Sequence, residues 1–242
     1  MHIETASLDY RDGGTALQAR VAWDADMRGP RPGVLVSHAW RGRTDFENDK
    51  AVALARLGYV GFALDLYGAG ITGSSAAENR KLMQPLLDDR ARLQQRMQLA
   101  LSELRRLETV DAARCAAIGF CFGGLCVLDL ARSGADIGGV ASFHGLPGAP
   151  ANTAGKRITA SVLVMHGWDD PMAPPADMLA LCRELTAQGA DWQLHAYGHT
   201  LHAFSNPQAD DAANGLCFNA TAERRSWRTL RHFLDEIFES EE

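Results

Sequence analysis

A cysteine set among glycines is the first feature of this sequence that could do chemistry. The run Gly119-Phe-Cys-Phe-Gly-Gly124 lies between an apolar stretch and a helical pattern that continues to Ala131. It has the form of a nucleophile elbow with cysteine in place of serine, in which small residues flank a turn too tight for side chains. At a helix N-terminus the positive end of the peptide dipoles favours a thiolate. We therefore predict that Cys121 is a nucleophile; the alternative is a cysteine buried for packing.

A pair of carboxylates could orient the base that such a nucleophile needs. The segment Gly167-Trp-Asp-Asp-Pro171 directly follows the apolar run 161–166, which places Asp169 and Asp170 beyond the end of a predicted strand. We expect Asp170 to be the acid of a catalytic triad. Asp169 is the alternative, and either residue could instead cap the helix that is predicted to begin near Pro175.

Two histidines follow the last predicted strand and could supply the base. The segment Tyr197-Gly-His-Thr-Leu-His-Ala-Phe204 contains both of them. We expect His202 to be the base, because the apolar Phe204 could seat its loop, and His199 is the alternative. The chain order of nucleophile, acid and histidine is one that is known for such triads.

Other arrangements of the same residues predict different proteins. A metal cluster of His195, His199, His202 and Cys217 is disfavoured, because His195 falls inside a predicted strand and the next two lie in a loop. We therefore expect neither a metal nor another cofactor. A class I amidotransferase-like cysteine enzyme would use a His-x-Glu pair; the one such pair here, His2-Ile-Glu4, lies in the polar opening of the chain and not beyond a predicted strand end, which disfavours this alternative. A non-catalytic binding module that keeps the elbow for packing remains an alternative.

The elements that must position these residues alternate between apolar runs and helical patterns. Six buried strands are predicted, at 33–38, 59–64, 115–119, 137–143, 161–166 and 191–197. Helical patterns lie at 46–57, about 79–107, and 221–239, and two short strands are possible in the polar opening. Because parallel strands need crossover helices, this alternation predicts an α/β fold with a mostly parallel central sheet and helices on both faces.

Length, composition and charge narrow the class of protein. The 242 residues are 46% hydrophobic and 22% charged, which is typical of a globular chain, and we expect a single domain over 1–242. A net charge of −6 offers no basic surface for nucleic acid or anionic membranes. The segment Met1 to Arg11 lacks the pattern of a secretory signal and five cysteines suggest no disulfide framework, so we expect a cytoplasmic protein.

Taken together, the motifs resemble those of the dienelactone hydrolase family, also called carboxymethylenebutenolidases, of the α/β-hydrolase superfamily. The resemblance extends over most of the chain and is carried by six segments: 34–42, 57–59, 64–67, 119–124, 166–171 and 202–204. It implies an α/β-hydrolase fold, Cys121 as nucleophile, Asp170 as acid and His202 as base. It also implies an oxyanion hole formed by the backbone N–H groups of Trp40 and Phe122.

The resemblance implies an ester or lactone hydrolase that acts through a thioester and has a small molecule as its partner. Substrate contacts are expected from Arg80, Trp168 and Phe204. Two positions depart from the family pattern. The family's glutamate that holds the resting thiol falls at Ala39, and its carboxylate-anchoring arginine falls at Asn206. Because a thiolate leaves more easily than an alkoxide, we expect activated enol or aryl esters to be preferred over alkyl esters.

Overall fold

The computed structural model describes residues 1–239, and its chain divides into two compact units. The first unit is Met1–Ile118 and the second begins at Gly119. Strand β5, Val110–Phe120, crosses this division and ends immediately before Cys121.

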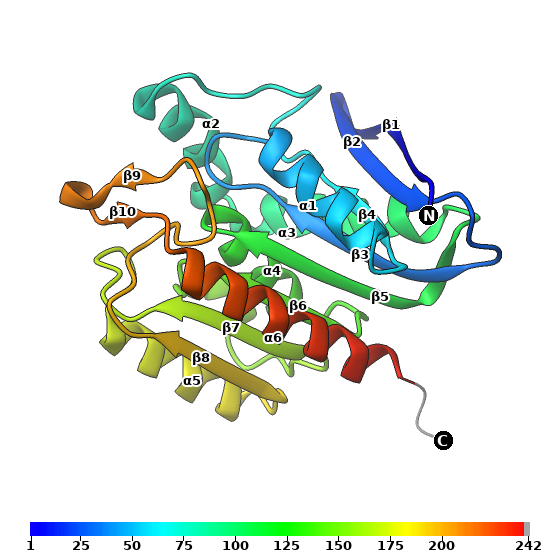
Figure 1. Cartoon of the computed structure of the whole chain (residues 1–242). Helices are drawn as coiled ribbons and strands as arrows, with labels where there is room; N and C mark the ends of the chain where they lie inside the picture. The colour runs from blue at the N-terminus through cyan, green and yellow to red at the C-terminus, as the bar shows by residue number, and fades with distance from the viewer. Residues whose placement is uncertain (240–242) are drawn as a thin grey trace. The chain divides into compact units, whose positions relative to one another are not determined.

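The first unit is a sheet with helices on both of its faces. Its strands β1 (Ile3–Asp12), β2 (Thr15–Asp24), β4 (Val60–Ala63) and β3 (Arg31–Ser37) follow the order β1-β2-β4-β3. Strands β3 and β4 are parallel, and β2 is antiparallel to both β1 and β4. Figure 1 shows helix α1 (Asp45–Ala55) on one side of these strands and helix α3 (Arg90–Arg105) on the other. The two opening strands have ten residues each, so the prediction of short strands was wrong: they pair along their whole length.

The long helical pattern predicted at 79–107 is two helices. Helix α2 spans Ala76–Asp88 and α3 begins at Arg90, so the chain breaks at Asp89. The Asp89 carboxylate accepts a hydrogen bond from the Arg92 amide (3.0 Å), which caps the second helix. Pro85 lies in the last turn of α2, where its ring removes one hydrogen-bond donor and favours the break.

The second unit contains three parallel strands covered by helices on both faces. Strands β6 (Gly139–Phe143), β7 (Ser161–Gly167) and β8 (Trp192–Tyr197) are neighbours in that order. Figure 1 shows α6 (Ala220–Phe238) on one side of them, with α4 (Phe122–Arg132) and α5 (Pro175–Ala187) on the other. A Cβ at Gly139 would lie 2.7 Å from the Phe233 ring, so the absence of a side chain there lets α6 pack closely on β6.

Short irregular elements connect these strands and helices. A 3-10 turn spans Ala151–Thr153, and a second one, Ala212–Asn214, joins the two-residue strands β9 (Asp210–Asp211) and β10 (Leu216–Cys217). This small hairpin was not predicted, because two-residue strands have no readable periodicity. Among the helices of residues 1–239, none combines the length and apolar character needed to cross a membrane.

Candidate active site

Cys121 occupies a sharp turn between β5 and α4. Its backbone has φ 55° and ψ −114°, a conformation that residues with a side chain rarely adopt. The Cys121 amide donates a hydrogen bond to Phe143 O at the end of β6 (3.0 Å), which holds the turn against the neighbouring strand. The side chain is partly exposed. Cys121 is therefore a half-buried residue held in a strained conformation at the N-terminus of α4.

Glycines on both sides of Cys121 allow the chain to come close to itself. A Cβ at Gly119 would lie 2.0 Å from Gly123 O, and one at Gly124 would lie 2.6 Å from the Cα of Gly145. Both distances are shorter than any real carbon contact of that kind. The glycines therefore let the start of α4 fold back over β5 and pack against the loop that follows β6.

Replacing Gly119 with alanine should destabilise the second unit and misplace the thiol. The added methyl group would meet backbone atoms rather than a flexible side chain, so we expect a loss of about 1–3 kcal/mol or more in the free energy of unfolding. Chemical denaturation of the variant would measure this loss. Gly148→Ala is the matched control, because a Cβ there meets nothing within 4 Å; equal stability of the two variants would contradict the close approach at Gly119.

Asp170 and His202 form a buried pair. The His202 Nδ1–H donates to Asp170 Oδ2 at 2.7 Å, and the two side chains are 1% and 0% exposed. The other carboxylate oxygen, Oδ1, accepts a hydrogen bond from the Met172 amide (2.8 Å). Both oxygens of Asp170 are thus engaged, which fixes the carboxylate and through it the orientation of the imidazole ring.

The two alternative residues, Asp169 and His199, face each other outside this buried site. Their closest charged atoms, His199 Nδ1 and Asp169 Oδ2, are 3.8 Å apart, and the side chains are 102% and 47% exposed. Such a pair is screened by water and is worth little energy. The structure therefore brings Asp170 together with His202 and leaves the neighbouring aspartate and histidine in solvent.

The charge of His202 is coupled to Cys121. Burial acts to lower the pKa of His202, but the negative charge of a Cys121 thiolate and the hydrogen bond to Asp170 outweigh it and raise the pKa to about 10. Cys121 and Asp170 therefore both favour the protonated form of the His202 imidazole.

The backbone of the His202 loop is held by strand β10. The His202 amide donates to Gly215 O (2.9 Å), and the Cys217 amide donates to His202 O (3.1 Å). A Cβ at Gly215 would lie 2.2 Å from Pro171, the residue that follows Asp170. The hairpin that sequence patterns missed therefore supports both members of the Asp170–His202 pair.

Three other predicted site residues belong to the same unit. Phe122 is the first residue of α4, so its amide lies in the helix turn that directly follows Cys121. Trp168 is 43% exposed and stands between β7 and Asp170, where it could contact a ligand. Phe204 is fully buried and its ring packs against Tyr197 (5.5 Å). Phe204 therefore seats the histidine loop, and its burial argues against direct contact with a substrate.

The remaining predicted residues belong to the first unit. Trp40 lies in the turn after β3, where its carbonyl oxygen accepts a hydrogen bond from the Tyr67 hydroxyl (2.9 Å). Arg80 is exposed on α2. The roles expected for these two residues stay predictions. In the second unit, the Asn206 Oδ1 accepts a hydrogen bond from the Gln208 amide (3.0 Å), so this side chain stabilises a local turn.

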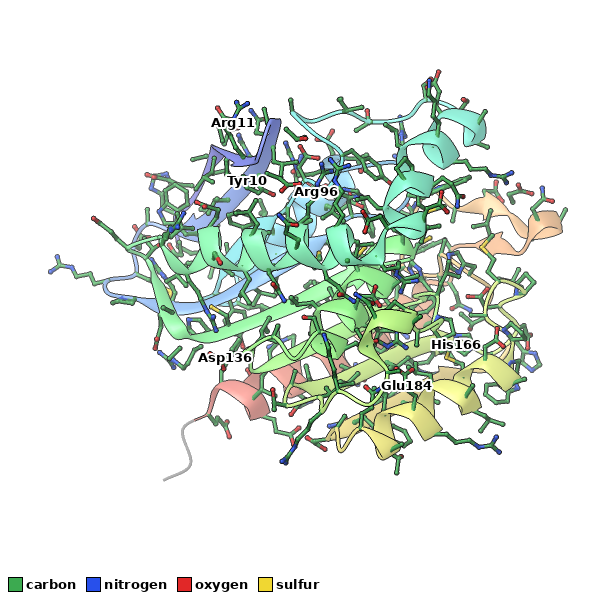
Figure 2. All side chains as sticks on the ribbon, turned by 180° about the vertical axis from the view of Figure 1, so that it is seen from behind. Tyr10, Arg11, Arg96, Asp136, His166 and Glu184 are labelled. Carbon is green, nitrogen blue, oxygen red and sulfur yellow. The ribbon has the colours of Figure 1, made fainter. Side chains whose placement is uncertain are left out.

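Two buried histidines next to the Asp170–His202 pair were not identified from the sequence. The His144 ring lies 5.1 Å from the His202 ring, and its Nε2 shares a hydrogen bond with Ser205 Oγ (2.8 Å). His166, labelled in Figure 2, is fully buried at the end of β7. Burial lowers the pKa of His166, as does the charge of His202, while Asp170 acts in the opposite direction. His144 directly follows the predicted apolar run 137–143, and His166 is the last residue of the run 161–166, so a position at a strand end is the signal that could have found both.

The residues considered as a metal cluster do not converge. His195 lies in strand β8, as expected, while His199 and His202 lie in the following loop. In the part of the chain that the structure describes, no group of three His, Cys, Asp or Glu side chains has the arrangement of a metal site.

Comparisons with known proteins find relatives that match almost the whole chain. The family model described as the dienelactone hydrolase family matches residues 17–238. The crystal structure of a dienelactone hydrolase-like promiscuous phosphotriesterase from metagenomic libraries is 38% identical, with a TM-score of 0.94 over 99% of this chain and 100% of that one. A probable 2-oxo-3-(5-oxofuran-2-ylidene)propanoate lactonase from Bradyrhizobium sp. is 29% identical over 97% of this chain and 96% of its own.

A more distant solved structure shows the same fold. The dienelactone hydrolase of Anabaena variabilis is 18% identical, with a TM-score of 0.66 over 96% of this chain and 99% of that one. These likenesses confirm the predicted α/β-hydrolase fold. The match over almost the whole chain identifies this protein as a hydrolase that belongs to the dienelactone hydrolase family.

Proposed function

We propose that this protein hydrolyses activated esters or lactones of small molecules with a triad of Cys121, His202 and Asp170. The observation that carries the proposal is the buried His202–Asp170 hydrogen bond of 2.7 Å, in an imidazole whose charge is coupled to the thiol of the elbow. Nucleophile, base and orienting acid are the three roles that covalent acyl transfer requires.

In the first half of the cycle, the Cys121 thiolate attacks the carbonyl carbon of the ester. The electron pair of the C=O bond moves onto oxygen, and in this proposal the Phe122 N–H stabilises that charge. One such donor is worth about 3 kcal/mol in the transition state. When the C–O bond breaks, the His202 imidazolium gives its proton to the leaving oxygen, and a thioester on Cys121 remains.

In the second half, water hydrolyses the thioester. Neutral His202 removes a proton from water as the oxygen attacks the thioester carbonyl, and the C–S bond then breaks to release the acid and the thiolate. The Asp170 carboxylate keeps the proton on Nδ1 and stabilises the imidazolium that forms. Thiolate and imidazolium are thereby restored for the next turnover.

The leaving group should decide which esters are hydrolysed. The tetrahedral adduct expels either the thiolate, whose acid has a pKa near 8.5, or the ester oxygen. A phenol has a pKa of about 10, as in tyrosine, so its oxyanion competes well with the thiolate as a leaving group. An alkyl alcohol has a pKa close to that of water, about 16, so its alkoxide competes poorly. We expect kcat/KM for phenyl acetate to exceed that for ethyl acetate by at least about 100-fold. Initial rates on both esters would measure this, and equal rates would contradict a thiolate nucleophile.

The pH profile should show activity into the alkaline range. Because the thiolate and Asp170 raise the pKa of His202 to about 10, the imidazolium that protonates the leaving group persists well above the usual value for histidine. We expect kcat/KM to fall only as the pH rises through about 10, after subtraction of hydroxide hydrolysis. Asp170→Asn should move this alkaline limb to lower pH. Loss of activity near pH 6.5 in the unmodified enzyme would contradict the coupling.

A second candidate activity is the hydrolysis of phosphotriesters. The dienelactone hydrolase-like promiscuous phosphotriesterase is 38% identical to this protein and covers 99% of its chain. The same thiolate could attack phosphorus and expel an aryloxide, and water could then cleave the S–P bond. Paraoxon and p-nitrophenyl acetate release the same p-nitrophenolate, so one absorbance assay compares both. Loss of both activities in Cys121→Ala would support one shared site; paraoxon turnover that survives in this variant would contradict it.

A further inference from the structure

His144 connects the three segments that carry the proposed triad. It follows strand β6, whose last residue, Phe143, accepts the Cys121 amide hydrogen bond. The His144 amide donates to Met165 O on β7 (2.8 Å), the strand that leads to Asp170. The side chain turns toward the third segment, since its Nε2 contacts Ser205, three residues after His202. His144 thus connects the chain segments that carry Cys121, Asp170 and His202.

The His144 ring lies directly against the base. Its centroid is 5.1 Å from that of His202, with the two planes inclined at 67°, and 5.0 Å from that of Phe204 at 82°. His144 and Ser205 are 2% and 1% exposed, so water does not weaken their hydrogen bond of 2.8 Å. Edge-to-face packing on two rings and a polar link at Nε2 together restrict how the His144 ring can turn.

The backbone at His144 is in a strained conformation. Its φ of 39° lies in the left-handed region that favours glycine. A residue with a side chain persists there only when its surroundings hold it, and such positions cluster at active sites. Here the surroundings are the Met165 carbonyl, the Ser205 hydroxyl and two aromatic rings.

We propose that His144 is a positioning residue: linked to Ser205, its ring holds the His202 imidazole in the orientation that serves both Asp170 and Cys121. This inference rests on the proposed function, because it assigns His202 as the base. His144 takes no proton in the cycle. It acts through His202, adding a ring contact to the hydrogen bond with Asp170 and the backbone contacts near β10.

Two variants remove the His144–Ser205 hydrogen bond, one from each side, while an aromatic ring stays next to His202. Ser205→Ala removes the hydrogen-bond partner and keeps both rings, while His144→Phe keeps an aromatic ring and removes Nε2. Because misplacement of a reacting group by even 1 Å costs about 100-fold, we expect each variant to lower kcat on phenyl acetate by about 10- to 100-fold with little change in KM. The double variant should lose no more than the worse single variant, since both changes break one contact.

The titration of His202 gives a readout that does not depend on turnover. Histidine ring NMR would follow His202 in the unmodified protein and in both variants, which leave Cys121, Asp170 and His166 intact. We expect the pKa of His202 to fall in each variant, together with the alkaline limb of the activity profile. An unchanged titration, or additive losses in the double variant, would overturn the positioning role. Survival of activity in Cys121→Ala would instead overturn the proposed function, so the two failures are distinguishable.

Discussion

Replacing Cys121 with alanine is expected to abolish ester hydrolysis. The thiolate forms the covalent bond to the acyl group in the proposed cycle, and no other side chain of the elbow could take its place, because its neighbours are phenylalanines and glycines. We expect kcat to fall by at least about 10⁴-fold. Steady-state rates on phenyl acetate, with a thermal melt to show that the fold is retained, would measure this.

The matched control for this prediction is Cys126→Ala. Cys126 lies in the same helix, five residues further on, and is fully buried. Its loss should reduce stability without removing the nucleophile. Iodoacetamide should label the unmodified protein rapidly at one thiol, and Cys121→Ala should lose that rapid phase. If the alanine variant hydrolysed phenyl acetate at the unmodified rate, Cys121 would not be the nucleophile.

Changes to the buried acid–base pair should be nearly as damaging. His202→Gln removes the group that donates and accepts the proton, and Asp170→Asn removes the charge that fixes its tautomer and stabilises the imidazolium. We expect each to lower kcat by about 10⁴-fold. The pair Asp169 and His199 supplies matched controls one and three residues away in the chain. Because that pair is solvated, His199→Gln and Asp169→Asn should change kcat by less than about fivefold.

The four variants discriminate between the two possible assignments of the site. Large losses in His202→Gln and Asp170→Asn with small losses in the other two would support the buried pair. The reverse pattern would transfer the roles to His199 and Asp169. Measuring all four on one ester at one pH and at saturating concentration compares kcat without the influence of KM.

Local chemistry explains why much of the fold could be predicted from the sequence. The apolar run at 161–166 is almost wholly buried and coincides with β7 to within one residue. The run at 191–197 coincides with β8 equally well, but β8 is an edge strand whose residues are mostly half-buried, which is why polar residues alternate in it. The break at Asp89 was missed because Pro85 and a capping aspartate interrupt an otherwise continuous helical pattern. The hairpin at 210–217 was missed because strands of two residues have no readable periodicity. It is held instead by hydrogen bonds with the backbone of His202.

The sequence by itself determined the elbow around Cys121, because the need for glycine at 119 and 124 arises from atoms a few residues away in the chain or in the adjoining loop. It also placed an Asp-Asp pair and two histidines beyond strand ends. Only the tertiary structure decided that Asp170 and His202 are the buried partners and that His144 packs on them. The burial of these side chains depends on contacts with β10 and Ser205. The residues next to Asp170, His202 and His144 in the sequence do not specify those contacts.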